Sequence, residues 1–265
     1  QWNSSDYVHL LTEIERRAYA DRAEHMGDPD YWDVPLDMFK SKKYAKKRIY
    51  NINMNKATPS DNVYAGNPNG YESDETTHYS VVDQWGNAVS ITTTINLSYG
   101  NGRVVEGAGF FLNNEMDDFS AKPGVPNAFG LIGNEANSIA PSKRPLSSMT
   151  PTIVLKERKP FLIIGSPGGS TIITTAMQTI LNVIDHKMDI KEAVCASRFH
   201  SQWLPDVIQI EPRGLSKDVL INLKSRGHKI VHRGGYIGES NGIMITNEGF
   251  FGGGDCRGET FSVGY

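Results

Sequence analysis

Thr76 is the residue of this sequence whose position most directly suggests covalent chemistry. It separates a segment rich in Asn, Pro, Gly, Ser and Asp (residues 51–75) from a run of β-branched residues that begins at Thr77. Self-cleavage of the Glu75–Thr76 bond would give Thr76 a free α-amine beside its own hydroxyl. Such an amine has a pKa of about 7.7–8.0, so its neutral form can act as the base that activates the hydroxyl. The alternative interpretation is an ordinary strand threonine.

Three carboxylates lie close together in the segment 112–120, at Glu115, Asp117 and Asp118. Glu115 and Asp118 could together hold a substrate ammonium group by charge-assisted hydrogen bonds. The same composition also fits a solvated acidic turn or a calcium-binding loop.

Two further segments could supply hydrogen-bond donors. Ser147 and Ser148 stand beside a predicted strand, where their hydroxyls can bind a carboxylate or form a turn. Gly165-Ser-Pro-Gly-Gly-Ser170 joins a predicted strand to a predicted helix, and backbone N–H groups at such a helix N-terminus can stabilise a developing oxyanion. This segment lacks the lysine and the spacing of a nucleotide P-loop, but a plain strand-to-helix turn would have the same composition.

Helices and strands must position these segments. The hydrophobic periodicity and the capping and breaking residues predict helices over 6–26, 36–50, 170–186, 190–197 and 216–226. Strands are predicted over 151–156, 160–165, 207–211 and 229–232, with hairpins over 77–95 and 242–253. Helices that follow strand pairs on an antiparallel sheet indicate an α+β layered fold. The helix at 36–50 is rich in lysine, which we interpret as a solvated face rather than a site for an anionic partner.

The composition excludes several classes of function. The 265 residues carry 27 Lys and Arg against 30 Asp and Glu, and this balance argues against a nucleic-acid partner. No apolar run approaches the roughly 18 residues of a membrane-spanning helix. The histidines are scattered without metal-ligand spacing, so we expect no metal and no cofactor. Cys195 and Cys256 could form one disulfide or stay reduced.

Taken in order along the chain, these segments resemble the γ-glutamyltranspeptidase family of the N-terminal nucleophile hydrolases. The resemblance covers nearly the whole chain. Its densest motifs are Thr76-Thr-His-Tyr-Ser-Val-Val-Asp83, Asn113-Asn-Glu-Met-Asp-Asp-Phe-Ser120, Pro145-Leu-Ser-Ser-Met-Thr-Pro-Thr152 and the segment from Gly165 to Ser170. Upstream, Ala18-Tyr-Ala-Asp-Arg22 looks like part of the last helices of the family's large subunit.

The resemblance implies the roles of the reacting groups. Thr76 would be the nucleophile both of self-cleavage at Glu75–Thr76 and of a γ-glutamyl ester intermediate. Thr94 would orient the Thr76 hydroxyl, and the N–H groups of Gly168 and Gly169 would form the oxyanion hole.

The resemblance also implies which residues bind the donor. Its α-amino group would be held by Asn96, Glu115 and Asp118, and its α-carboxylate by Ser147 and Ser148. Phe129 would be the aromatic gate of a lid loop. The family uses a further arginine for the carboxylate, from an earlier part of the large subunit, and many bacterial members have an amide where this chain has Glu115.

The implied fold is a four-layer αββα sandwich of the N-terminal nucleophile hydrolase type, present here in part. Residues 1–75 would be the C-terminal helical segment and linker of the large subunit, and residues 76–265 the small, catalytic subunit. Truncation inside the large subunit would explain why the sequence starts at Gln1. The remainder of that subunit is then an expected partner.

The implied activity is transfer of a γ-glutamyl group from glutathione or another γ-glutamyl donor to water, an amino acid or a peptide. Family resemblance places it in the periplasm or outside the cell. The alternatives are a related amide acylase for glutaryl-type side chains, a poly-γ-glutamate-processing enzyme, or a folded but inactive fragment. Glu115 and Asp118 favour a γ-glutamyl donor, because an ammonium cage has no purpose for a donor without an α-amine.

Overall fold

Thr76 lies directly before a β-hairpin in a computed structural model that describes residues 1–64 and 76–264. The hairpin pairs β1 (Thr77–Val82) with β2 (Ala88–Thr93) in antiparallel register. The carboxylate of Asp83 closes its turn by accepting hydrogen bonds from the N–H groups of Trp85 and Asn87, at 3.0 and 2.8 Å. The predicted hairpin is confirmed.

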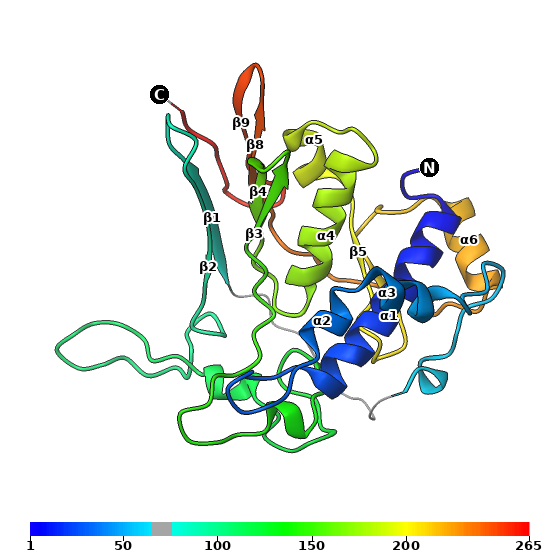
Figure 1. The fold of residues 1–265 in the computed structure, drawn as a ribbon, viewed down its shortest axis with the longest axis horizontal. Coiled ribbons are helices and arrows are strands. Elements are labelled where there is room, and N and C mark those ends of the chain that lie inside the picture. The colour runs from blue at the N-terminus through cyan, green and yellow to red at the C-terminus, as the bar shows by residue number, and fades with distance from the viewer. Residues whose placement is uncertain (65–75, 265) are drawn as a thin grey trace.

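A four-stranded antiparallel sheet packs against this hairpin (Figure 1). Its strand order is β3 (Thr152–Lys156), β4 (Lys159–Gly165), β8 (Asn241–Thr246) and β9 (Gly249–Gly253). The Ser90 hydroxyl of the hairpin donates to the Ile164 carbonyl at 3.1 Å, which joins the two sheets. The three residues 162–164 of β4 are fully buried, so β4 lies at the centre of the core.

Helices α4 (Thr171–Ile184) and α5 (Ile190–Cys195) cover the other face of this sheet (Figure 1). Leu162 and Ile164 of β4 pack there against Val183, Ile190 and Val194. Each such side chain contributes about 1.5–3 kcal/mol when it leaves water. Within the described residues the layers therefore follow the order β, β, α, and the expected α+β sandwich is confirmed.

A third, small sheet lies beside the helical layer. It consists of β5 (Phe199–His200), β6 (Ile208–Ile210) and β7 (Ile230–His232). The sequence predicts these two strands with a helix between them but not their pairing, and in the structure β6 and β7 pair in parallel. The reason is that α6 (Lys217–Ser225) connects them, and a helical crossover returns the chain in the same direction.

Helix α1 (Ser5–His25) runs across the molecule and has two packing regions. Its first half buries Val8 and Leu11 against the third sheet and α6. Its second half buries Tyr19, Ala20 and Ala23 against the loops around residues 129–132 and 203–204. This helix is therefore held by packing along both halves of its length.

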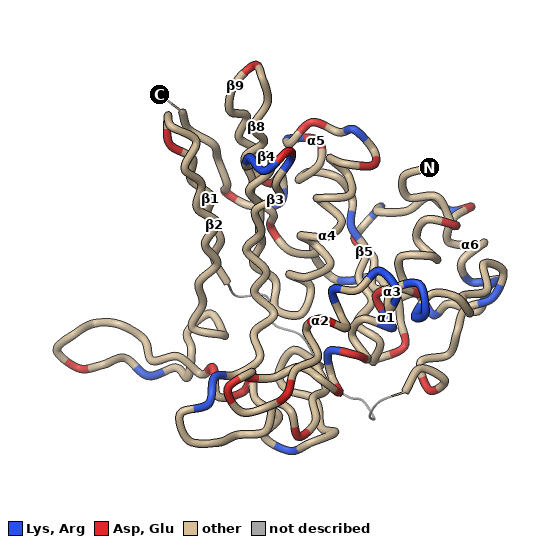
Figure 2. Tube along the Cα trace, viewed as in Figure 1, with Lys and Arg blue, Asp and Glu red and all other residues tan. Residues whose placement is uncertain are grey.

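The helix predicted over 36–50 is two helices, α2 (Leu36–Phe39) and α3 (Lys42–Ile49). The prediction of one helix is wrong because Ser41 takes an extended backbone and its hydroxyl accepts from the N–H groups of Lys43 and Tyr44. That contact starts a new helix at this point. Figure 2 shows the basic residues gathered on α3, which has no buried residue, as expected for a solvated face.

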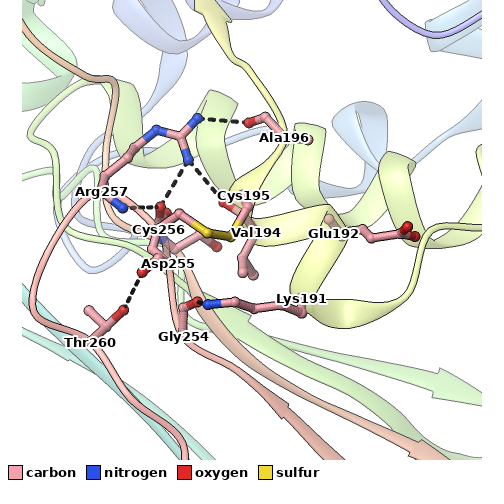
Figure 3. The surroundings of a disulfide bond; sticks show 12 residues. Lys191, Glu192, Val194, Cys195, Ala196, Gly254, Asp255, Cys256, Arg257 and Thr260 are labelled. Carbon is pink, nitrogen blue, oxygen red and sulfur yellow. Dashed lines mark hydrogen bonds and ion pairs between the residues drawn. A yellow bond between two sulfur atoms is a disulfide. The ribbon is translucent and has the colours of Figure 1, made fainter.

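Cys195 at the end of α5 forms a disulfide with Cys256, which follows β9 (Figure 3). Arg257 reinforces this junction by donating to the carbonyls of Val194 and Ala196, at 3.0 and 2.8 Å. Its guanidinium also pairs with Glu211. The alternative that the sequence left open is thus decided in favour of the disulfide.

Three short 3-10 helices complete the described secondary structure: η1 (Ser60–Asn62), η2 (Glu115–Asp118) and η3 (Glu135–Asn137). Among the helices within residues 1–64 and 76–264, none combines the length and the apolar character needed to cross a membrane.

Candidate active site

Thr76 and Thr94 face each other at one end of the hairpin. The strand register pairs Thr77 with Thr93, so the residues just outside this pair lie opposite one another. Their hydroxyl oxygens are 3.5 Å apart. The N–H group of Asn96 donates to the Thr94 hydroxyl at 2.8 Å, which fixes that oxygen beside Thr76. The structure thus brings together two of the predicted catalytic residues, whereas Glu75 lies outside the described residues.

The turn between β4 and α4 lies against the same end of the hairpin. A side chain at Gly165 would meet the ring of His78, two residues beyond Thr76, at 2.3 Å. Gly168 and Gly169 have φ angles of +132° and +53°. Within the part of the chain that the structure describes, their N–H groups have no hydrogen-bond acceptor. Two free donors at the N-terminus of a 14-residue helix suit an anionic oxygen.

Neighbouring segments fix this turn from two directions. The Tyr19 hydroxyl of α1 donates to the Ser170 carbonyl at 2.6 Å. On the other side, the N–H group of Glu239 donates to the Ser166 hydroxyl at 3.0 Å. A turn held in this way can keep the donors of Gly168 and Gly169 aimed at one point without rearranging.

The ammonium-binding candidates lie on the segment after β2 and on η2. Asn96 has a φ of +77° and is 2% exposed, and its amide donates to the Asn114 carbonyl at 3.2 Å. The Asp117 carboxylate accepts from the Ala128 N–H at 2.7 Å and so caps the next loop. By contrast, the carboxylates of Glu115 and Asp118 accept no hydrogen bond from the described residues. They remain available to a ligand.

Burial raises the pKa of Asp118 to about 6. The positive charge of Arg22 acts in the opposite direction, and the negative charges of Glu115 and Asp117 add to the rise. A carboxylate with this pKa is ionised at neutral pH and can accept an ammonium group, but it loses that ability in mild acid.

The carboxylate-binding candidates lie on the loop before β3. The Ser147 hydroxyl accepts from the Met149 N–H at 3.0 Å, and the Ser148 hydroxyl accepts from the Arg22 guanidinium at 3.1 Å. This loop and the Asp118 turn border one small cavity, whose lining also includes Arg22 and Asn137. The structure therefore places Asp118 and Leu146, the neighbour of Ser147, on one cavity, and Arg22 adds a positive charge to its lining.

Arg22, Asn137 and Tyr19 are the residues of this region that sequence reasoning missed as site residues. Arg22 lies inside the motif Ala18-Tyr-Ala-Asp-Arg22, which carried the family resemblance but no predicted role. Asn137 has no local signal, since its side-chain partners Asp118 and Leu146 belong to two other segments, 19 and 9 residues away.

Phe129, the predicted lid residue, is buried in this structure, with 5% of its surface exposed. It packs in the cluster that contains Tyr19, Leu131 and Trp203. Its carbonyl accepts from the Gln202 side chain at 3.3 Å. The structure therefore places Phe129 in the core beside α1, and its role as a gate stays a prediction.

Three potential metal ligands, His9, Glu13 and His228, meet away from this site. The sequence analysis missed this group because His228 is remote in sequence. Two of its nitrogens, His9 Nδ1 and His228 Nε2, share a hydrogen bond of 2.7 Å. Glu13 forms ion pairs with Arg16 and Arg17, whose positive charges oppose a cation there. We therefore assign this cluster to the core.

A threonine at the start of a strand, a glycine turn with unpaired N–H groups against the same end of the hairpin and a β, β, α order of layers are the features of an N-terminal nucleophile hydrolase. Within that class, comparison with known proteins identifies the family. The whole chain, residues 1–265, matches the family model described as γ-glutamyltranspeptidase, and the chain belongs to this family.

Individual relatives agree with this assignment. The chain is 47% identical over 266 residues to the glutathione hydrolase proenzyme of Escherichia coli (strain K12), covering 100% of this chain and 46% of that protein. The chain thus spans about half the length of that relative. A crystal structure of the Helicobacter pylori γ-glutamyltranspeptidase T380A mutant is 57% identical with a TM-score of 0.67, covering 69% of this chain and 100% of that one. An acylase ACY 1 proenzyme of Pseudomonas sp. (strain SE83) is 36% identical, covering 96% of this chain and 43% of that protein.

Proposed function

We propose that this chain is the C-terminal part of a self-cleaving γ-glutamyltransferase and glutathione hydrolase. Residues 1–75 would end its large subunit and residues 76–265 would form its small subunit, with the rest of the large subunit as partner. The matched Helicobacter pylori chain supports this boundary, since it aligns with 69% of the present chain. Residues 76–265 make up 190 of the 265 residues, about 72%.

The observation that carries the proposal is the contact between the Thr76 and Thr94 hydroxyls at the start of the hairpin, 3.5 Å apart. After cleavage, the α-amine of Thr76 would take the proton of its own hydroxyl. The hydroxyl oxygen would attack the γ-carbonyl carbon of the donor, and the resulting oxyanion would be bound by the N–H groups of Gly168 and Gly169. The leaving amine would receive the proton, and the γ-glutamyl group would remain as an ester on Thr76.

The second half of the reaction would reverse these roles. Water, an amino acid or a peptide would attack the ester carbonyl, and the Thr76 amine would accept the proton of that attacking group. Return of the proton to the Thr76 oxygen would free the enzyme. Water gives hydrolysis and an amine gives transfer.

Donor recognition would use both ends of the glutamyl head. Asn96, Glu115 and Asp118 would hold its ammonium group, and Ser147 and Ser148 its carboxylate. The similarity to an acylase proenzyme supports an amide acylase as the second candidate, for which the sequence analysis suggested a glutaryl-type donor. The free carboxylates of Glu115 and Asp118 favour the γ-glutamyl donor, because a glutaryl group has no amine to bind.

A periplasmic or extracellular location is part of the proposal. The Cys195–Cys256 disulfide supports it, since disulfides persist mainly in oxidising compartments.

The decisive experiment replaces Thr76→Ala in the full-length protein. We expect the variant to stay uncut by intact-mass measurement and to release no anilide from a γ-glutamyl anilide. Thr77→Ala is the matched control, because its exposed side chain lies one residue away, and it should be cut and active. Cleavage or turnover in Thr76→Ala would refute the proposal. A preference for glutaryl over γ-glutamyl amides in the wild type would favour the acylase.

A further inference from the structure

We infer that Arg22 of α1 is a positioning residue of the donor site, which sets the hydroxyl of Ser148 and the charge of Asp118 for a γ-glutamyl head. This inference rests on the proposed function. Arg22 lines the cavity, and it bonds Ser148 of one predicted binding half while acting electrostatically on Asp118 of the other.

The hydrogen bond from Arg22 orients the hydroxyl group of Ser148. The Arg22 guanidinium donates to the Ser148 oxygen at 3.1 Å and to the carbonyls of Leu146 and Ser147 at 3.4 Å. Because a guanidinium can only donate, Ser148 accepts in this contact and its own proton is left to donate elsewhere. A hydroxyl polarised in this way is prepared to donate to the α-carboxylate of the donor.

The effect on Asp118 concerns charge. The charged groups that act on this carboxylate are Arg22 of α1 and the neighbouring Glu115 and Asp117 of η2. Burial and the two carboxylates raise the pKa of Asp118 to about 6, and Arg22 is the one of these groups that lowers it. Removal of Arg22 would therefore leave Asp118 protonated over a wider pH range, and a protonated carboxyl binds an ammonium group poorly.

Asn137 of η3 also connects the turn at Asp118 with the loop at 146–148. Its amide donates to the Asp118 carbonyl at 2.7 Å, and its side-chain oxygen accepts from the Leu146 N–H at 3.0 Å. The separation of the two turns is thus fixed by Asn137, which carries no charge. This leaves Arg22 with the tasks that need a cation, namely polarising Ser148 and keeping Asp118 ionised.

The test measures kcat, KM and pH dependence for a γ-glutamyl anilide in the full-length protein with Arg22→Met and Arg22→Lys. For Arg22→Met we expect KM to rise about tenfold or more, as for loss of a charged hydrogen bond, with a smaller change in kcat. The acidic limb of kcat/KM should move upward by about one pH unit. Arg22→Lys keeps the charge but lacks the planar fork, so it should keep the wild-type acidic limb while KM still rises.

A glutaryl anilide and a second arginine serve as controls. The glutaryl donor has no ammonium, so the shift of the acidic limb should vanish with it. Arg48→Met removes an arginine that bonds Asp21, the neighbour of Arg22 in α1, and should leave KM and the acidic limb unchanged.

Two results would overturn the inference alone: an unchanged KM and acidic limb in Arg22→Met, or equal shifts of the acidic limb in Arg22→Met and Arg22→Lys. If Arg22→Met does not fold, Arg22→Lys decides, because an unchanged KM or a displaced acidic limb in that variant contradicts the proposed role. Absence of Thr76-dependent turnover in the wild type would instead refute the proposed function, and this inference with it.

Discussion

The disulfide between Cys195 and Cys256 makes a quantitative prediction about stability. It closes a loop across a sequence separation of 61 residues. Closing a loop of that length removes chain entropy from the unfolded state that is equivalent to about 4 kcal/mol at 25 °C. We therefore expect the double variant Cys195→Ala/Cys256→Ala to lose about 4 kcal/mol in the free energy of unfolding, measured by urea denaturation.

The folded state should change little, because other contacts hold the same two segments together. Arg198 forms a buried ion pair with Asp255 at 2.7 Å, and the Ser240 N–H donates to the same carboxylate at 2.6 Å. The Arg257 guanidinium donates hydrogen bonds to the carbonyls of Val194 and Ala196 at the end of α5, as Figure 3 shows. Near-ultraviolet circular dichroism and γ-glutamyl anilide turnover in the double variant should thus match the wild type below the unfolding transition.

Reduction provides the matched control. The wild type in reductant should unfold at the same urea concentration as the double variant, and reductant should have no effect on the double variant. A loss smaller than about 1 kcal/mol would refute the loop-entropy reasoning. A loss of native circular dichroism in the double variant would show instead that the disulfide, and not the arginine contacts, holds the junction.

Two further predictions concern the oxyanion turn and the buried histidines. Gly168→Ala places a Cβ 2.5 Å from the Thr171 hydroxyl oxygen at a φ of +132°, so kcat should fall about 100-fold or more, while Gly234→Ala, which has open space, should keep wild-type kcat. Burial, and then the charge of His9, lower the pKa of His228 to about 4. The unfolded chain then binds more protons between about pH 4 and 6.5, so stability should fall by up to about 3 kcal/mol as the pH drops through this range. His78 and His9 also have lowered pKa values, so in His228→Gln the fall should become smaller by the share of His228, measured by urea titrations at several pH values. Curves parallel to those of the wild type would contradict the assigned cause.

The sequence predicted the elements whose signals are local. The hairpins, α1 and α4 each have a periodicity and end signals within their own residues, and their observed bounds lie within a few residues of the predicted ones. The prediction of a single helix over 36–50 was wrong for a local reason as well. The Ser41 hydroxyl accepts hydrogen bonds from two backbone N–H groups and so starts a second helix. The parallel pairing of β6 and β7 follows from the helical crossover α6 between them, and the strand, helix, strand order predicted from the sequence is compatible with it.

In the candidate site, too, some contacts were expected from the sequence and others were found only in the structure. The contact of Thr76 with Thr94 was expected from the family resemblance, and the hairpin register of the structure brings the two residues together. The contacts of Arg22 with the loop at 146–148 span more than 120 residues, and those of Asn137 link two segments through side-chain amides. The sequence around Arg22 in α1 does not indicate a partner in the loop at 146–148. Its contact with that loop is therefore seen only in the structure.

The position of α1 has a consequence for a chain cut between Glu75 and Thr76. This helix lies before the proposed cleavage site, yet it buries Val8 and Leu11 against β6 and α6 and buries Tyr19 beside Trp203. Each of these side chains contributes about 1.5–3 kcal/mol, and the Tyr19 hydroxyl also anchors the turn between β4 and α4 through the Ser170 carbonyl. The two pieces should therefore remain one folded unit after cleavage, because the contacts that join them do not involve the broken bond. Cleavage would then free the Thr76 amine without releasing the helix that positions the donor site.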